Sequence, residues 1–263
     1  MPIVRKIALR RLEQPEFGRI AYEVMECVFK MHRELGRLFD EVVYKHELAE
    51  RLPNVLLEVP VVVGHESFNK TYYFDAVVNQ GALFEFKAVE FLTPLHRMQL
   101  LNYLLLADLA HAKLVNLRTD KVEHEFINTS LRLADRRKFE LVVTDYAKDA
   151  VSREFEERLV ALVKDWGTGL ELPLYEEAMV HFLGGEQQVI RDVDVIISGR
   201  KTGIKKMRLA APGMAFKLTA LEEDAGAFEQ HARRLLQHTR LDAILWVNIA
   251  RAQLTFKTLK NNL

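Results

Sequence analysis

The sequence predicts an α/β protein made of two tandem copies of one fold, each a central mixed sheet flanked by helices. A length of 263 residues suits one large domain or two small ones. Helical and strand patterns alternate along the first half, and the same order returns in the second. We therefore expect domains over residues 1–130 and 150–263, joined by a connecting segment over 131–149.

The elements of the first half follow from periodicity and turn chemistry. Apolar residues at three- and four-residue spacing predict a helix over 16–35, and the pattern resumes over 42–48 before Pro53. Thr93 and Pro94 suit the cap and first turn of a helix reaching about Ala107. Strands are predicted over 55–63, 71–78, 82–89, 113–117 and 121–127, with turns over 64–70 and 79–81.

The second half repeats residues of the first at a nearly constant offset. The pairs aligned at an offset of 131 or 132 residues include Gly36 with Gly167, Tyr44 with Tyr175, Phe84 with Phe216 and Asn116 with Asn248. Two nearly equal offsets maintained over most of a domain indicate an internal duplication.

Composition excludes several classes of protein. The 37 Lys and Arg residues cancel the 37 Asp and Glu residues, and 49% of the chain is hydrophobic, which excludes a uniformly basic coat protein and a disordered chain. The single cysteine, Cys27, excludes an internal disulfide and fits a reducing compartment. No apolar run is long enough to span a membrane, and none follows the basic N-terminal residues. We expect a cytoplasmic protein without membrane contact.

Acidic and basic residues occur together on two neighbouring predicted strands. Glu85 and Lys87 alternate on one strand, so both project from the same face. Asp75 lies on the preceding strand, which the turn at 79–81 folds alongside. Carboxylate oxygens are the ligands that Mg²⁺ prefers, and a nearby lysine can stabilise charge on a phosphate. These residue types are the ones that metal-assisted phosphodiester hydrolysis requires.

An ordinary solvated strand face is the alternative interpretation of Glu85 and Lys87. The flanking residues argue against it, because the strand over 82–89 is almost entirely apolar, as expected of a strand buried on both faces. Charges inside such a strand are costly unless they are paired or bound to a metal.

Several segments together resemble a known family. They are Gly36-Arg-Leu-Phe-Asp-Glu41-Val-Val-Tyr44, Phe74-Asp75, Phe84-Glu85-Phe86-Lys87-Ala88-Val89, and Leu95-His96-Arg97-Met98-Gln99-Leu100-Leu101-Asn102-Tyr103-Leu104. In this order they resemble the GxxExxY proteins of the PD-(D/E)XK nuclease superfamily, over about residues 17–128. The resemblance implies a restriction-endonuclease-like fold and a site that uses Mg²⁺ or Mn²⁺.

The resemblance also implies roles for individual residues. Asp75, Glu85 and Lys87 would form the core triad, Glu41 a helix-borne acid that joins Asp75 and Glu85 at the metal, and Gln99 a polar residue of the next helix. Three supporting residues come from spacing. Tyr44 lies three residues after Glu41 and could share its hydrogen-bond network. His96 and Tyr103 flank Gln99 on one helical face, where ordinary packing or a helix-surface contact is the favoured interpretation.

The second copy lacks these residue types. Leu172, Met207, Lys217, Thr219 and His231 occupy the positions of Glu41, Asp75, Glu85, Lys87 and Gln99. We therefore expect a degenerate repeat without catalysis of its own.

Basic residues concentrate in the second copy instead. The cations are Arg200, Lys201, Lys205, Lys206 and Arg208. Such a basic hairpin suits binding to a phosphate backbone, although lysines that protect an edge strand from aggregation explain it equally well. A second cluster, Arg132, Arg136, Arg137 and Lys138, would extend the basic track.

The leading hypothesis is a divalent-metal-dependent nuclease acting on DNA or RNA, with chemistry in the first copy and structural or substrate-positioning work in the second. The alternatives are a non-catalytic nucleic-acid-binding protein and a protein-assembly scaffold on a nuclease fold. Nucleic acid is the expected partner, and a homo-oligomer is left open.

Overall fold

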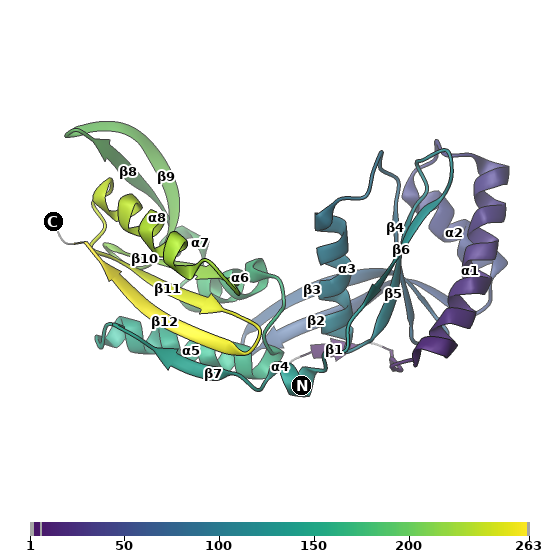
Figure 1. The fold of residues 1–263 in the computed structure, drawn as a ribbon, viewed down its shortest axis with the longest axis horizontal. Helices are drawn as coiled ribbons and strands as arrows, with labels where there is room; N and C mark the ends of the chain where they lie inside the picture. Colours follow the sequence, from purple (N-terminus) through teal and green to yellow (C-terminus); the bar gives the residue numbers. More distant parts are fainter. Residues whose placement is uncertain (1–2, 6, 262–263) are drawn as a thin grey trace. The chain divides into compact units, whose positions relative to one another are not determined.

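The structure is a computed structural model that describes residues 3–5 and 7–261. It divides into an N-terminal unit, Met1–Leu133, and a C-terminal unit, Ala134–Leu263. Each unit contains one six-stranded mixed sheet flanked by helices (Figure 1). The predicted fold class, two tandem restriction-endonuclease-like domains, is therefore confirmed. Residues 1–2, 6 and 262–263 fall in the expected domains but lie outside the described residues.

The N-terminal sheet has the strand order β1-β2-β3-β4-β5-β6, in which only β4 and β5 pair in parallel. Its strands are β1 (Ile3–Arg5), β2 (Val55–His65), β3 (Phe68–Val78), β4 (Ala82–Lys87), β5 (His111–Asn116) and β6 (Glu123–Asn128). Its helices are α1 (Gln14–Leu35), α2 (Glu41–Arg51) and α3 (Pro94–Ala107). A parallel pair needs a crossover connection, and α3 provides it between β4 and β5.

Several predicted boundaries are wrong by a few residues, and two of them have a clear physical cause. The turn expected over 64–70 is confined to Glu66 and Ser67, because the β2–β3 ladder continues to the pair His65–Phe68. The strand expected over 82–89 ends at Lys87. Beyond that point the backbone N–H and C=O of Val89 bond to the side-chain amide of Asn116, so no strand neighbour is needed.

One face of the N-terminal sheet is covered by α1. The helix buries Phe17, Val24, Val28 and Met31 against side chains of the sheet that include Phe84. Cys27 lies in the same buried cluster, as expected of a core residue. Burying this apolar stripe anchors α1, since most of the stability of a helix in a protein comes from packing.

The C-terminal sheet has the order β7-β12-β11-β10-β9-β8. Its strands are β7 (Glu140–Val143), β8 (Ile190–Ile197), β9 (Arg200–Ala211), β10 (Met214–Thr219), β11 (Ala243–Ile249) and β12 (Gln253–Lys260). The remaining helices are α4 (Leu133–Arg136), α5 (Ala150–Trp166), α6 (Leu172–Phe182), α7 (Glu186–Val189) and α8 (Ala225–Gln237). Residues 131–149, expected as a connection, contain β7, which pairs in parallel with β12.

The two sheets share their central register at an offset of 132 residues. Leu83 pairs with Ala112 across β4 and β5, and Ala215 pairs with Ile244 across β10 and β11. A polar contact repeats at the same offset, because Asn248 bonds to both backbone groups of Leu221 as Asn116 bonds to those of Val89. In strand order the two sheets differ in the added edge strands, β1 beside β2 and β7 beside β12. The two units therefore share more than a general architecture.

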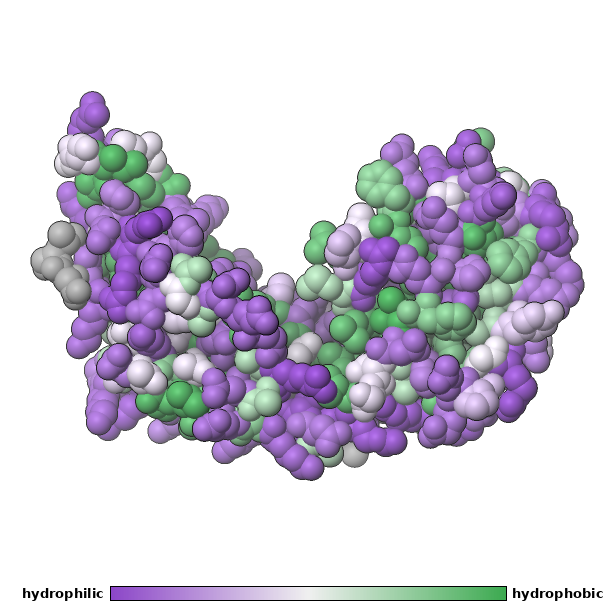
Figure 2. Space-filling view, viewed as in Figure 1, coloured by the Kyte–Doolittle hydropathy of each residue, from purple (hydrophilic) through white to green (hydrophobic). Residues whose placement is uncertain are grey.

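Most apolar side chains lie inside the two cores. Hydrophilic residues cover most of the surface visible in Figure 2, with apolar residues in smaller groups. Within the described part of the chain, no helix is both long and apolar enough to span a bilayer.

Candidate active site

The site forms where β3 and β4 separate. The β3–β4 ladder ends at the pair Ala76–Phe84, and the next residue of each strand is an acid, Asp75 and Glu85. The Asp75 carboxylate replaces a ladder partner by accepting a hydrogen bond from the backbone N–H of Phe86, at 2.9 Å. Both acids are buried, with exposed fractions of 8% for Asp75 and 1% for Glu85. Two carboxylates are thus held side by side at the opening of the sheet.

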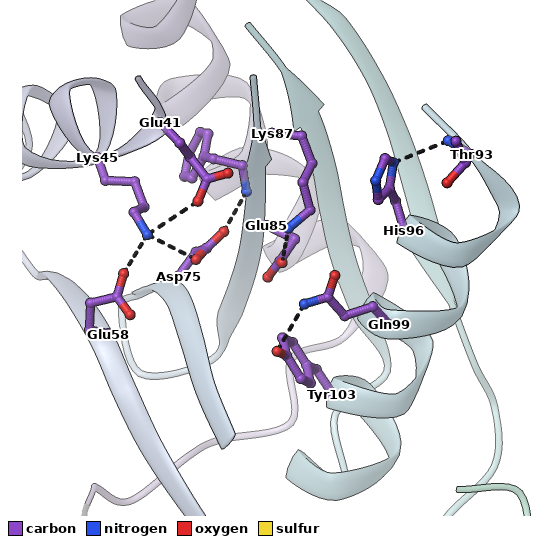
Figure 3. A network of polar contacts seen from close by, with 11 residues as sticks. Glu41, Lys45, Glu58, Asp75, Glu85, Lys87, Thr93, His96, Gln99 and Tyr103 are labelled. Carbon is purple, nitrogen blue, oxygen red and sulfur yellow. Dashed lines mark hydrogen bonds and ion pairs between the residues drawn. The ribbon is translucent and has the colours of Figure 1, made fainter. Parts of the chain in front are cut away.

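A buried lysine, Lys45, contacts three acids from three elements (Figure 3). Its Nζ lies 3.0 Å from Asp75 Oδ1 and 3.3 Å from Glu41 Oε1, and it also bonds to Glu58. Burial opposes the charged form of Lys45, but its hydrogen bonds to Glu58 and Asp75, together with the charges of Asp75 and Glu41, raise its pKa, so the ammonium persists. Lys45 therefore neutralises much of the negative charge that Asp75 and Glu41 bring.

Glu58 reaches this network because β2 is distorted. The β2–β3 register places Glu58 opposite Asp75, but the ladder is interrupted between the pairs Leu57–Ala76 and Val59–Phe74. Glu58 has a positive φ of 48°, which is uncommon for a residue with a side chain. Opposed like charges destabilise a sheet, and the Lys45 ammonium between the two acids compensates for that.

Lys87 and Glu85 form a second pair, with Lys87 Nζ 2.6 Å from Glu85 Oε1. Even so, burial and the neighbouring Asp75 charge raise the pKa of Glu85 to about 8. The other carboxylate oxygen, Oε2, is buried with no hydrogen-bond partner. Burial likewise raises the pKa of Glu41, with the Asp75 charge acting in the same direction. Negative charge is therefore undercompensated around Glu85, where an additional cation would be stabilised.

The helix α3 carries the remaining predicted residues. Gln99 Nε2 donates to Tyr103 Oη at 3.0 Å, and Figure 3 shows this pair on the side of Glu85 away from Lys45. Tyr103 is 8% exposed, and its ring packs on Phe74 with centroids 5.0 Å apart. Gln99 is thus oriented by a tyrosine that is itself held by packing.

His96 has a local structural contact. Its Nδ1 accepts a hydrogen bond from the backbone N–H of Thr93, the residue that precedes α3. Burial lowers the pKa of His96, and the nearby Lys87 charge adds to this. A neutral His96 is therefore favoured, which suits an acceptor at the start of the helix.

The spacing of Tyr44 and Glu41 predicts a shared hydrogen-bond network, but the hydroxyl of Tyr44 bonds elsewhere. Its ring is fully buried, and its hydroxyl donates to the backbone C=O of Gly36 at 2.6 Å. The C-terminal unit has the same bond between Tyr175 and Gly167, without the acidic residues. The bond joins the end of one helix to the next in both copies, so the supporting role expected for Tyr44 is structural.

The acidic side chains of the site are of the kind that binds a hard divalent cation, but they are not positioned around a common point. Asp75, Glu85 and Glu41 offer carboxylate oxygens, and the partnerless Oε2 of Glu85 is an orphaned acceptor. Within residues 3–5 and 7–261, however, no three His, Cys, Asp or Glu side chains are grouped closely enough to hold a metal ion. The Lys45 ammonium instead contacts one oxygen each of Asp75 and Glu41.

The equivalent place in the C-terminal unit has other contacts. Thr219, at the position of Lys87, accepts a hydrogen bond from Trp246 Nε1 at 2.9 Å and donates to Asn248. Glu176, at the position of Lys45, pairs with Arg208 at 3.1 Å, so an acid stands here in place of the lysine. Polar side chains here stabilise the fold without assembling carboxylates.

The basic residues of the C-terminal unit divide into two groups. Arg200 to Arg208 lie on the part of β9 that pairs with β8, and Lys201 is paired with Asp194 at 2.5 Å. The second cluster is not a continuous basic surface. Arg136 is 2% exposed and donates to the backbone C=O groups of Trp166 and Thr168, which excludes it from the expected track.

The N-terminal unit is a restriction-endonuclease-like domain. Its mixed sheet opens between β3, which carries Asp75, and β4, which carries Glu85 and Lys87. Residues 18–129, most of the N-terminal unit, match a family model described as PD-(D/E)XK nuclease superfamily. The match ends before the C-terminal unit, and the narrower GxxExxY resemblance stays a prediction. No curated protein and no solved structure matches the chain significantly.

Sequence reasoning missed two residues of the site, Lys45 and Glu58. Lys45 follows Glu41 by four residues on a predicted helix, a spacing that places both on one face and could have revealed it. Glu58 is an isolated acid in a valine-rich strand. Only the β2–β3 register, which places it opposite Asp75, brings it within reach of Lys45.

Proposed function

We propose that the N-terminal unit is a divalent-metal-dependent nuclease that hydrolyses phosphodiester bonds of DNA or RNA. The observation that carries the proposal is the buried, undercompensated carboxylate of Glu85 beside Asp75 and Lys87, at the point where the sheet opens. The superfamily match over residues 18–129 supports the same chemistry.

Asp75 and Glu85 would hold the ion, with Glu41 as a third ligand once the Lys45 ammonium withdraws from it. When bound, Mg²⁺ or Mn²⁺ would activate water and stabilise negative charge on the phosphate. Asp75 is suited to this role because its Oδ2 is already fixed by the Phe86 N–H. Glu85 is suited because one of its oxygens has no other partner.

The other residues of the site would act on the substrate. Lys87 carries an ammonium beside Glu85, where it can orient the attacking water or stabilise charge on a phosphate oxygen. Gln99 presents its amide next to this pair, held by Tyr103, and would position the water or the substrate. Lys45 would neutralise the charges of Glu58 and Asp75 when no metal is present.

The C-terminal unit would contribute contacts to the phosphate backbone. Arg200, Lys205 and Lys206 are exposed on β9, in the part of that strand that pairs only with β8. Cations on such a hairpin can follow a nucleic-acid backbone without reading its sequence. The competing explanation, protection of a sheet edge, predicts no salt-dependent binding.

The test is a cleavage assay with single- and double-stranded DNA and RNA in Mg²⁺ or Mn²⁺. Cleavage should disappear with a chelator and fall at least about 100-fold in Glu85→Gln and Lys87→Ala, since each removes charge stabilisation at the reacting phosphate. Glu26→Gln and Lys30→Ala, which alter an exposed pair on α1, are matched controls. Unchanged cleavage in both site variants would refute the assignment.

A non-catalytic role is the second candidate, and one observation favours it. Lys45 already neutralises Asp75 and Glu41, so the network is stable without a metal. Nucleic-acid binding that needs Lys205 and Lys206 but is indifferent to metal, without cleavage, would support this candidate.

A protein-assembly role rests on the exposed apolar residues of α3 and the turn before it, Phe91, Leu95, Met98 and Leu101. It predicts a stable oligomer in solution that Leu95→Glu with Met98→Glu dissociates. A chain that stays monomeric at every concentration would exclude it.

A further inference from the structure

A cavity lies in the C-terminal unit at the place of the missing catalytic residues. Its volume is about 290 Å³, and it opens between β9, β10 and α8. Met207, Lys217 and His231 line it, at the positions that Asp75, Glu85 and Gln99 have in the first copy. For Lys217 the shared register of β4–β5 and β10–β11 makes this correspondence structural as well as sequential.

Charge at this place is reversed between the copies. The cations that line the cavity are Lys205, Lys206, Arg208 and Lys217, with His231 beside them. No acid is among the lining residues. Because side chains alternate along β9, Lys206 lies on the face of Arg208, which is paired with Glu176 of α6, whereas Lys205 lies on the face of Met207. The side chains of Lys205 and Lys217 form no ion pair with any described residue. The cavity is therefore electropositive, and an anion is the complementary ligand.

The rest of the lining is apolar, including Phe216, Phe228, Leu235 and Ile244. Phe228 is held by Trp246, with ring centroids 4.8 Å apart. A bare phosphate would meet the lysines but leave this apolar surface exposed. A ligand that combines an anionic group with a flat aromatic group satisfies both parts, since aromatic side chains bind bases by stacking.

We propose that this cavity binds a single nucleotide, with its phosphate between Lys205 and Lys217 and its base against the apolar surface at Phe228. The volume is near the lower end of ligand pockets, about 300 to 1,000 Å³, which suits one nucleotide. The source is either a free mononucleotide or the unpaired terminal nucleotide of a strand. This site adds to the backbone contacts proposed above and does not require catalysis in the N-terminal unit.

The test is titration calorimetry on the full chain with a chelator present, using AMP and inorganic phosphate as probes. AMP should bind more tightly than phosphate. Lys217→Glu, which restores the acid of the first copy, should weaken AMP at least about tenfold, as expected for loss of a charge-assisted contact. Phe228→Leu should weaken AMP but not phosphate. Arg234→Ala, on α8 outside the cavity, is the control.

Two short single-stranded oligonucleotides, identical except for a 5′-phosphate or a 5′-hydroxyl, distinguish the sources. Tighter binding of the phosphorylated strand than of AMP, lost in Lys217→Glu, assigns the site to a strand end. Tighter binding of AMP assigns it to a free nucleotide. Equal affinity of wild type and Lys217→Glu for every probe, or equal affinity for AMP and phosphate, would overturn the proposal. Absence of cleavage in the nuclease assay leaves these measurements unaffected.

Discussion

Lys45 Nζ lies 3.0 Å from Asp75 Oδ1, so a buried lysine already contacts one oxygen of an acid that we propose as a metal ligand. The contact joins α2 to β3 through two buried side chains. It explains how a cluster of four acids, Glu41, Glu58, Asp75 and Glu85, is accommodated at a sheet opening. It also predicts that the Lys45 ammonium and a bound metal ion would compete for the same carboxylate oxygens.

Replacement of Lys45 should expose this competition. Lys45→Met leaves Asp75, Glu41 and Glu58 without their shared cation, which should lower the free energy of unfolding by about 3 to 5 kcal/mol in a chelator. Mg²⁺ or Mn²⁺ should recover part of the loss by binding the released oxygens. Urea unfolding with and without metal measures both effects. Lys30→Met, at an exposed pair, is the control, and equal recovery in that variant would contradict the prediction.

The raised pKa of Glu85 predicts pH-dependent stability. In the metal-free fold that pKa rises from 4.5 to about 8, so between these values the folded state binds more protons than the unfolded chain. The free energy of unfolding should therefore fall as pH rises from about 5 to 8, by up to about 4 kcal/mol, because one pKa unit is about 1.4 kcal/mol. Glu85→Gln should remove this slope. Thermal unfolding of the wild type and of Glu85→Gln between about pH 5 and 8 tests this. The same dependence of stability on pH in both proteins would contradict the prediction.

Tyr44 and Tyr175 should behave alike. Tyr44→Phe and Tyr175→Phe each remove one buried hydroxyl bond to a glycine carbonyl, which should cost about 1 kcal/mol of stability. Neither change touches an acid of the site, so any cleavage should retain the same rate per folded molecule. Denaturant midpoints and the cleavage assay check this together. A large loss of cleavage in Tyr44→Phe alone would restore the predicted link to Glu41.

Binding of nucleic acid should depend unequally on the cations of β9. Among the described residues Lys206 forms no ion pair, although Asp192 lies opposite it across β8 and β9, whereas Lys201 is paired with Asp194. Lys206→Ala should therefore lower the slope of log affinity against log salt concentration by about 1, and Lys201→Ala by less. Filter binding at several salt concentrations measures the slopes. Identical slopes for wild type and Lys206→Ala would support edge protection as the function of the hairpin.

Local pattern was sufficient for most of the elements. Periodic apolar spacing predicted α1 and α2, and Thr93 with Pro94 located the start of α3. Boundaries failed where partners far along the chain decide them: β4 ends at Lys87 because Asn116 satisfies the backbone beyond it. A strand end depends on which neighbour accepts the next hydrogen bond, and local propensity does not contain that information.

The sequence by itself determined the two-copy α/β architecture and the neighbourhood of Asp75, Glu85 and Lys87, because strand alternation and a short turn are local rules. Only the tertiary structure decided what each charge contacts. It placed Glu58 opposite Asp75 with Lys45 between them, and it buried Arg136 among backbone carbonyls. The physical reason is that burial and pairing in three dimensions set the cost of a charge, whereas residue type sets only its sign.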